Sequence, residues 1–259
     1  MVLTGTGAAR SSSSLTRSLS SVLALRLSLG LVALLGATAF FFGTSWDIQW
    51  HVLIGRDRTL IPPHLVMLTG AGISGIAALC AIVIETLWAR RDAVLARNTT
   101  SFAGMFSGSL GAYIIGFAAL NSAIAFPLDA YWHALYGIDV AILAPFHIMI
   151  ISGMALVALG SAYMLVSAAH LASRLDAPLA RRVATIGAMT ALALMMSIFT
   201  FLLFELIGRR WTLDLGFLSL NFFIAWRLCS AAGPLSRRRG CCPGAGRQPA
   251  LWRSTISLR

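Results

Sequence analysis

The chain has 259 residues, of which 58% are hydrophobic and only 11% are charged, and its mean hydropathy is +0.82. A soluble domain carries about 25% charged residues, so this composition excludes an ordinary soluble domain. The formal net charge is +11, but the arginines that supply it lie at the ends of apolar runs, which indicates membrane anchoring and excludes a nucleic-acid-binding face.

Residues 1–19 are polar and rich in Ser, and we expect them to form a disordered cytoplasmic N-terminus. Apolar runs of about 20 residues follow, which is the length that crosses a bilayer core of about 30 Å as a helix. These runs lie at about 22–45, 63–88, 103–127, 142–169 and 184–207, with a weaker one at about 213–229. They predict an all-α, polytopic membrane helix bundle of about six spans within residues 20–229. Its expected partners are the lipid bilayer and other membrane subunits.

The end of the chain has a different composition. Residues 230–259 are rich in Arg, Gly, Pro, Cys and Ser and contain no Asp or Glu. We expect either a disordered tail or an aberrant one from a shifted reading frame, and we assign it no function.

Arginines are distributed unevenly between the two sides of this predicted bundle. Nine lie in the N-terminal segment and in the second and fourth connections, against four in the first, third and fifth connections. Because arginine concentrates on the cytoplasmic side, we predict a multi-pass protein of the cell membrane with a cytoplasmic N-terminus. Connections 46–61 and 128–141 then face outward.

An internal repeat joins these two outward connections. The first copy holds Asp47, Trp50, His51, Gly55 and Asp57, which return 82 positions later as Asp129, Trp132, His133, Gly137 and Asp139. One inserted residue then aligns His64 with His147. The pattern predicts a parallel duplication of helix-loop-helix hairpins, with repeat 1 at about 22–88 and repeat 2 at about 103–169, related by a pseudo-two-fold axis along the membrane normal.

The repeated residues are those of a metal site. Asp and His at i and i+4 share one face of a helix, so Asp47 can converge with His51, and the same spacing recurs in the second copy. His64 and His147 each follow prolines that mark the first turn of a helix, where imidazolium is disfavoured and neutral imidazole can bind metal. One carboxylate and two imidazoles make a three-ligand transition-metal site with an open position. The candidate ligands, in two sites or one shared site, are Asp47, His51, His64, Asp129, His133 and His147.

The spacing Asp-x3-His-x12-His of Asp47, His51 and His64 resembles the metal-binding motif in the C subunit of particulate methane and ammonia monooxygenases. The resemblance covers about 18 residues and a similar multi-helix architecture. It implies a copper site near the outer membrane face with these three residues as ligands, so copper is favoured over zinc or iron. The second copy departs by one residue, since 14 positions separate His133 from His147. Oxygenase activity in that family depends on companion subunits, so whether this chain is an enzyme stays open.

Other interpretations of the same residues remain. The carboxylates could pair with Arg56, Arg58 or backbone amides in hydrogen-bonded loops. The Asp/His ring could instead line a cation or proton path in a small transporter or channel-like protein, or the chain could be a structural subunit.

Residues outside the six candidate ligands have simpler expected roles. Asp57 and Asp139 are expected to shape turns, and Trp46, Trp50, Tyr131 and Trp132 to form an aromatic belt. Glu85 is expected to reach toward Arg90 or Arg91. Glu205 is a candidate functional acid within a span, although Arg209 could pair with it.

Overall fold

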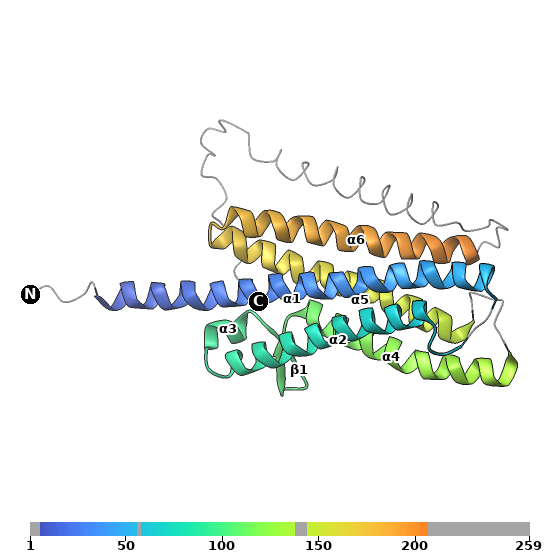
Figure 1. Ribbon diagram of the computed structural model, residues 1–259. Coiled ribbons are helices and arrows are strands. Elements are labelled where there is room, and N and C mark those ends of the chain that lie inside the picture. Colours follow the sequence, from blue (N-terminus) through green and yellow to red (C-terminus); the bar gives the residue numbers. More distant parts are fainter. Residues whose placement is uncertain (1–5, 56–57, 138–143, 207–259) are drawn as a thin grey trace, which may run out of the picture.

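The computed structural model describes residues 6–55, 58–137 and 144–206, and these form six helices and one β-hairpin. The elements in chain order are α1 (Thr6–Leu53), α2 (Pro62–Ala89), α3 (Ala93–Arg97), β1 (Thr100–Phe102), β2 (Phe106–Gly108), α4 (Leu110–Tyr136), α5 (Pro145–Arg174) and α6 (Pro178–Leu206) (Figure 1). The all-α prediction is confirmed.

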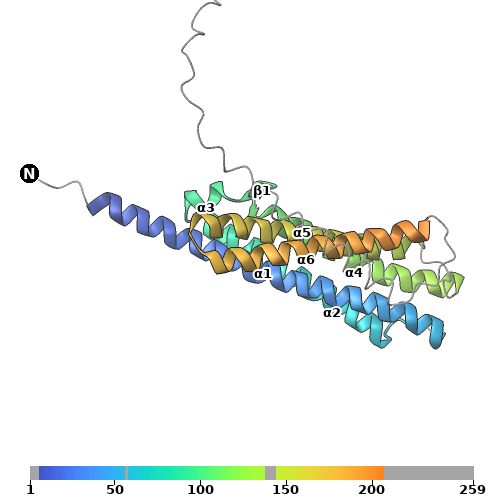
Figure 2. The same cartoon turned by 90° about the horizontal axis from the view of Figure 1, so that it is seen from above.

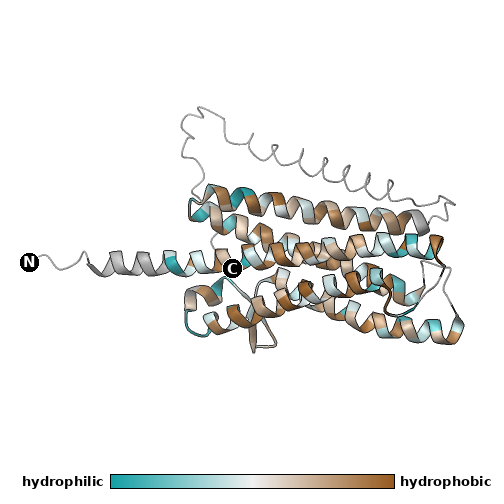
Figure 3. Cartoon of the chain, in the orientation of Figure 1, coloured by the Kyte–Doolittle hydropathy of each residue, from teal (hydrophilic) through white to brown (hydrophobic). Residues whose placement is uncertain are grey.

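Five of the six helices in the described part are long and apolar enough to cross a membrane. Their hydropathy is high along most of their length, and polar residues gather toward the ends (Figure 3). Large apolar side chains such as Leu35, Phe42 and Ile76 stay exposed on the outside of the bundle, as a lipid-facing surface requires. The chain is therefore a multi-pass membrane protein. The expected span at about 213–229 and the tail 230–259 lie outside the described residues.

Two helical hairpins make the centre of the bundle (Figures 1 and 2). Helix α1 packs on α2 and α5, α4 packs on α5 and α2, and α6 covers α5. Exchanging the hairpin α1–α2 with the hairpin α4–α5 turns the α1–α5 contact into the α4–α2 contact. This is the arrangement that a pseudo-two-fold axis would produce, although the duplication itself stays a prediction.

Within each hairpin, the two helices approach closely at matching small residues. A Cβ on Gly70 of α2 would lie 2.5 Å from the carbonyl oxygen of Gly36 on α1. A Cβ on Gly153 of α5 would lie 3.1 Å from the carbonyl oxygen of Ala118 on α4. Small residues let helix backbones approach closely where lipid supplies no hydrophobic drive. The offsets between these positions, 82 on the first helix and 83 on the second, are those of the Asp/His repeat.

The N-terminal expectation is wrong for residues 6–19. They continue α1, which begins at Thr6 and runs for 48 residues. No proline precedes Pro62, so a helix nucleated in the apolar part can extend toward the N-terminus by one hydrogen bond per residue.

The third span also begins later than expected. Residues expected to start it at about 103 form an antiparallel hairpin in which Thr100 pairs with Gly108. Ser109 then caps α4, because its hydroxyl accepts a hydrogen bond from the Ala112 backbone amide at 3.3 Å. The phenylalanines of the hairpin made this segment resemble a span in the sequence, yet Phe102 packs its ring on Tyr113 at 5.6 Å between centroids.

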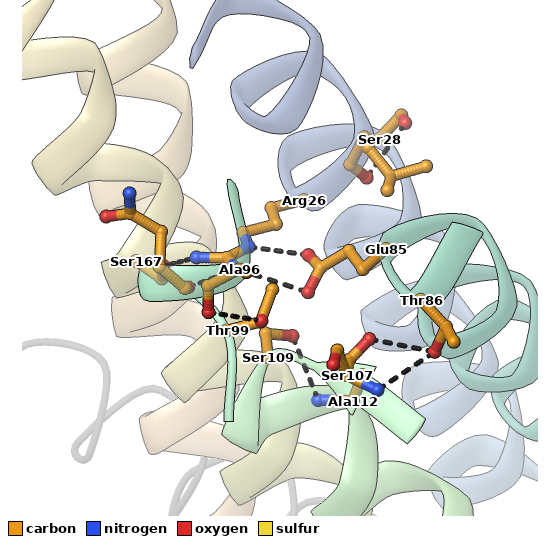
Figure 4. A network of polar contacts seen from close by, with 12 residues as sticks. Arg26, Ser28, Glu85, Thr86, Ala96, Thr99, Ser107, Ser109, Ala112 and Ser167 are labelled. Atoms are coloured by element: carbon orange, nitrogen blue, oxygen red, sulfur yellow. Dashed lines mark hydrogen bonds and ion pairs between the residues drawn. The ribbon is translucent and has the colours of Figure 1, made fainter. Parts of the chain in front are cut away.

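A buried ion pair ties three helices together at the end of the bundle opposite the Asp/His connections (Figure 4). Arg26 Nε of α1 lies 2.6 Å from Glu85 Oε1 of α2, and both side chains are buried. Arg26 also donates to Ser167 Oγ of α5 at 2.7 Å and to the Asn98 carbonyl at 2.9 Å. Glu85 was expected to reach toward Arg90 or Arg91, and this is wrong. A carboxylate this deeply buried requires a partner within the bundle, and Arg26 faces it across the helix interface.

Candidate metal centre

The first candidate set, formed by Asp47, His51 and His64, lies where α1 ends and α2 begins. Asp47 Oδ1 is 3.6 Å from His51 Nδ1, one turn later on α1. The same oxygen is 3.1 Å from His64 Nε2, in the first turn of α2. The hairpin thus brings together three residues that the sequence placed on two helices.

The second candidate set, formed by Asp129, His133 and His147, lies where α4 ends and α5 begins. Asp129 Oδ2 is 3.4 Å from His133 Nε2, and Asp129 Oδ1 is 3.4 Å from His147 Nε2. Each residue offers one ligand atom, and the three atoms lie within 4.8 Å of one another. Among the described residues, no other group of three acids, histidines or cysteines has ligand atoms this close together.

These separations match those between ligands of one ion. Two N or O atoms bound at about 2.1 Å to a tetrahedral ion are about 3.4 Å apart. Both Asp129–histidine distances in the second set are 3.4 Å. Asp129, His133 and His147 therefore already lie near the positions that ligands of one transition-metal ion would take.

One carboxylate oxygen in each set lacks a hydrogen bond. Asp47 Oδ1 and Asp129 Oδ1 are both buried from solvent and have no hydrogen-bond partner. Each nevertheless lies within 3.4 Å of a histidine Nε2, so these close approaches lack the geometry of a hydrogen bond. A buried oxygen that is not hydrogen-bonded is costly unless a cation compensates for it.

Backbone carbonyls determine which nitrogen of two histidines carries hydrogen. His64 Nδ1 lies 3.2 Å from the Thr59 carbonyl oxygen, and His133 Nδ1 lies 3.1 Å from that of Gly137. A carbonyl only accepts, so Nδ1 must be the donor and Nε2 of the neutral ring carries a lone pair. When neutral, each of these rings therefore directs an electron pair at a carboxylate. Metal-binding histidines commonly have this arrangement, with the second nitrogen fixed by the backbone.

The two sets differ in one histidine. His51 Nδ1 is 2.8 Å from the Asp47 backbone carbonyl, and it is also the nitrogen that approaches the Asp47 carboxylate. In the second set, His133 uses separate nitrogens for these two contacts. The histidine ring centroids are correspondingly 6.4 Å apart in the first set and 5.7 Å apart in the second. The second set is the better preorganised of the two.

Both sets reach one cavity of about 320 Å³. His64 of the first set and Asp129 and His133 of the second face it, and Phe126 lies between the sets with its ring centroid 6.3 Å from that of His64. The cavity is lined by Arg58, Thr59, His64, Phe126, Asp129, Ala130, His133, Ala134 and Gly137. The sets are therefore neighbouring sites with common solvent access.

Some contributors to this site were absent from the sequence interpretation. The carbonyl of Gly137 is one, and it can turn back on His133 because Gly137 adopts a φ of 86°, which favours glycine. The recurrence of this glycine in both repeats was the available signal. Phe126 and Thr59 carried no signal of their own.

The other residues singled out in the sequence either pack against aromatic rings or lie outside the described residues. Trp50 pairs with Trp46, and Trp132 packs against Tyr136 and Phe146 beside the second set. Asp57, Asp139 and the side chain of Glu205 lie outside the described residues.

Comparison with known proteins adds no assignment to this geometry. The chain matches no protein-family model, no curated protein and no solved structure.

Proposed function

We propose that this chain is an integral membrane protein that binds transition-metal ions, copper above all, at its two Asp/His sets. The observation that carries the proposal is the second set, where Asp129 Oδ1 is buried without a hydrogen bond and both histidines present Nε2 to the carboxylate at 3.4 Å. A divalent ion at that point would compensate for the buried carboxylate oxygen and bind the histidine nitrogens beside it.

The donor set favours copper, zinc or iron over harder ions, because imidazole suits these metals. Copper(II) heads the affinity order among divalent first-row ions, and the Asp-x3-His-x12-His resemblance points the same way. We assign the chain as a redox or monooxygenase-like component that acts with companion subunits, or as a metal-handling accessory. The arginine asymmetry supports an extracytoplasmic location for both sites, at the cell membrane.

A transporter or channel with a proton or cation path is the competing function. Such a path needs polar groups that continue from the cavity through the bundle. Within the described residues, the core beyond the sites is mostly apolar, with side chains such as Phe40, Met67 and Ile150. Its buried serines, such as Ser74 and Ser161, donate to backbone carbonyls. The Arg26–Glu85 pair at the opposite end is closed by its own hydrogen bonds. The geometry supports metal binding better.

Elemental analysis of the purified full chain tests the proposal. After copper loading and removal of free metal, we expect about two copper ions per chain, one for each set. The double variant His51→Ala/His133→Ala should retain little copper. His170→Ala is the matched control, because His170 is exposed near the opposite end of α5, and it should keep wild-type copper. Wild-type copper in the double variant, or none in the wild type, would refute the proposal.

A further inference from the structure

We propose that the cavity shared by the two sets binds a small coordinating anion, held by the open position of the metal and by Arg58. This inference rests on the proposed metal site in the second set, and it names the ligand class that the site admits. Arg58 and Thr59 line the cavity from the α1–α2 connection, whereas Asp129 and His133 line it from α4.

The summed charge of Arg58, Asp129 and a bound ion becomes positive when metal binds. Without metal, Arg58 and Asp129 cancel. A divalent ion on Asp129 leaves a local charge of about +2 with Arg58, because neutral histidines add none. Asp47 Oδ1 lies 3.1 Å from Nε2 of His64, which lines the cavity. When the first set holds no metal, the negative charge of Asp47 offsets part of this positive charge. The cavity thus becomes an anion site only in the metal-bound protein.

Size and distance agree with a small ligand. A cavity of 320 Å³ exceeds the roughly 30 Å³ share of one water and suits a triatomic anion or a small carboxylate with its hydration. A sphere of that volume is about 8.5 Å across, which is close to the Debye length of about 8 Å at physiological ionic strength. The positive charge of Arg58 therefore acts on any anion that the metal holds there.

Azide binding to the copper(II)-loaded full chain provides the test, since azide on copper(II) gives a charge-transfer absorption band. In chloride-free buffer, we expect saturable azide binding to the wild type. Arg58→Gln should weaken it by about 3- to 10-fold, a modest factor because Arg58 is solvent-exposed. Arg58→Lys keeps the charge and should stay within about 2-fold of wild type.

Controls separate this inference from the metal site itself. Arg90→Gln, an exposed arginine at the opposite end of the bundle, should leave azide affinity unchanged. Copper content is measured on every sample. Normal copper content with equal azide affinity in wild type and Arg58→Gln overturns the anion site and leaves the metal site standing. No copper in the wild type overturns both.

Discussion

Asp129 has surroundings that discriminate between a metal ligand and a structural ion pair. Its carboxylate is buried, it faces two histidine Nε2 atoms at 3.4 Å, and one of its oxygens has no hydrogen bond. Because the Gly137 carbonyl holds the hydrogen of His133 on Nδ1, the neutral ring cannot donate to this carboxylate. With His133 neutral, the Nε2 lone pair faces the carboxylate, an arrangement that a bound cation would relieve.

Replacing Asp129 by Asn should move stability and metal affinity in opposite directions. The amide can donate to a histidine lone pair, so the metal-free protein should gain about 1 kcal/mol and unfold at a higher temperature in detergent. Copper affinity should fall by more than about 100-fold, since a charged ligand is lost. Thermal unfolding and a chelator competition titration measure the two effects. A lower unfolding temperature would mean that protonated histidines form ion pairs with Asp129, which favours the structural interpretation.

The six candidate ligands could be found from the sequence because the repeat placed them at fixed spacings. His133 follows Asp129 by one helical turn, so their convergence is a local property of α4. The meeting of Asp129 with His147 depends on how α4 and α5 pack, which the repeat indicated only indirectly. The orientation of each ring could not be predicted, since it depends on carbonyls such as that of Gly137, whose positions follow from backbone angles.

Glu85 shows what sequence proximity misses in a bundle. Arg90 is five residues away and was the expected partner, whereas Arg26 is 59 residues away and is the observed one. We expect Glu85→Gln to leave the Arg26 charge buried without its counter-ion and to lower the free energy of unfolding by about 3–5 kcal/mol. Chemical unfolding in detergent measures this. Arg90→Gln is the control and should change stability little. A Glu85→Gln protein of wild-type stability would show that the pair is not needed to hold α1 on α2.

At the scale of elements, the close approach of the two helices in each hairpin sets the distance between the ligands that those helices carry. Gly70 lies six residues after His64 on α2, at the closest approach to α1, whereas a Cβ on Gly72 would meet nothing within 4 Å. The long helices were predictable from apolar length. The helical N-terminus and the β-hairpin were not, because the first depends on propagation from a neighbouring span and the second on the turn at Gly104, which lies at a φ of 68°.

Two neighbouring glycines of α2 give a matched pair of variants. Gly70→Ala places its Cβ 2.5 Å from the Gly36 carbonyl, so the backbones must separate. We expect lower stability, by about 1–3 kcal/mol, and weaker copper binding at the first set. Gly72→Ala meets open space and should gain about 0.5–1 kcal/mol from reduced chain entropy. Unfolding curves and copper titrations check both. Equal effects of the two substitutions would contradict the close helix crossing.

At the scale of the whole molecule, a cluster of arginines and the candidate sites lie at opposite ends of the bundle. The end where α2 finishes and α6 begins carries Arg90, Arg91, Arg97, Arg174, Arg181 and Arg182. The other end carries both Asp/His sets and the shared cavity. Within the described residues, the positive-inside rule predicts that this arginine-rich end faces the cytoplasm. The cavity, at the other end, then opens away from the cytoplasm.

Single-cysteine labelling decides this orientation. In a chain whose four native cysteines are replaced by Ser, Thr59→Cys lines the cavity and Ser173→Cys lies in the last turn of α5, next to the connection to α6. Both positions are exposed, so access depends on the side of the membrane. An impermeant maleimide should label Thr59→Cys in intact cells and Ser173→Cys only after lysis. The reverse pattern would put the metal sites on the cytoplasmic side, where they would draw on the cytoplasmic copper pool, while leaving their ligand geometry unchanged.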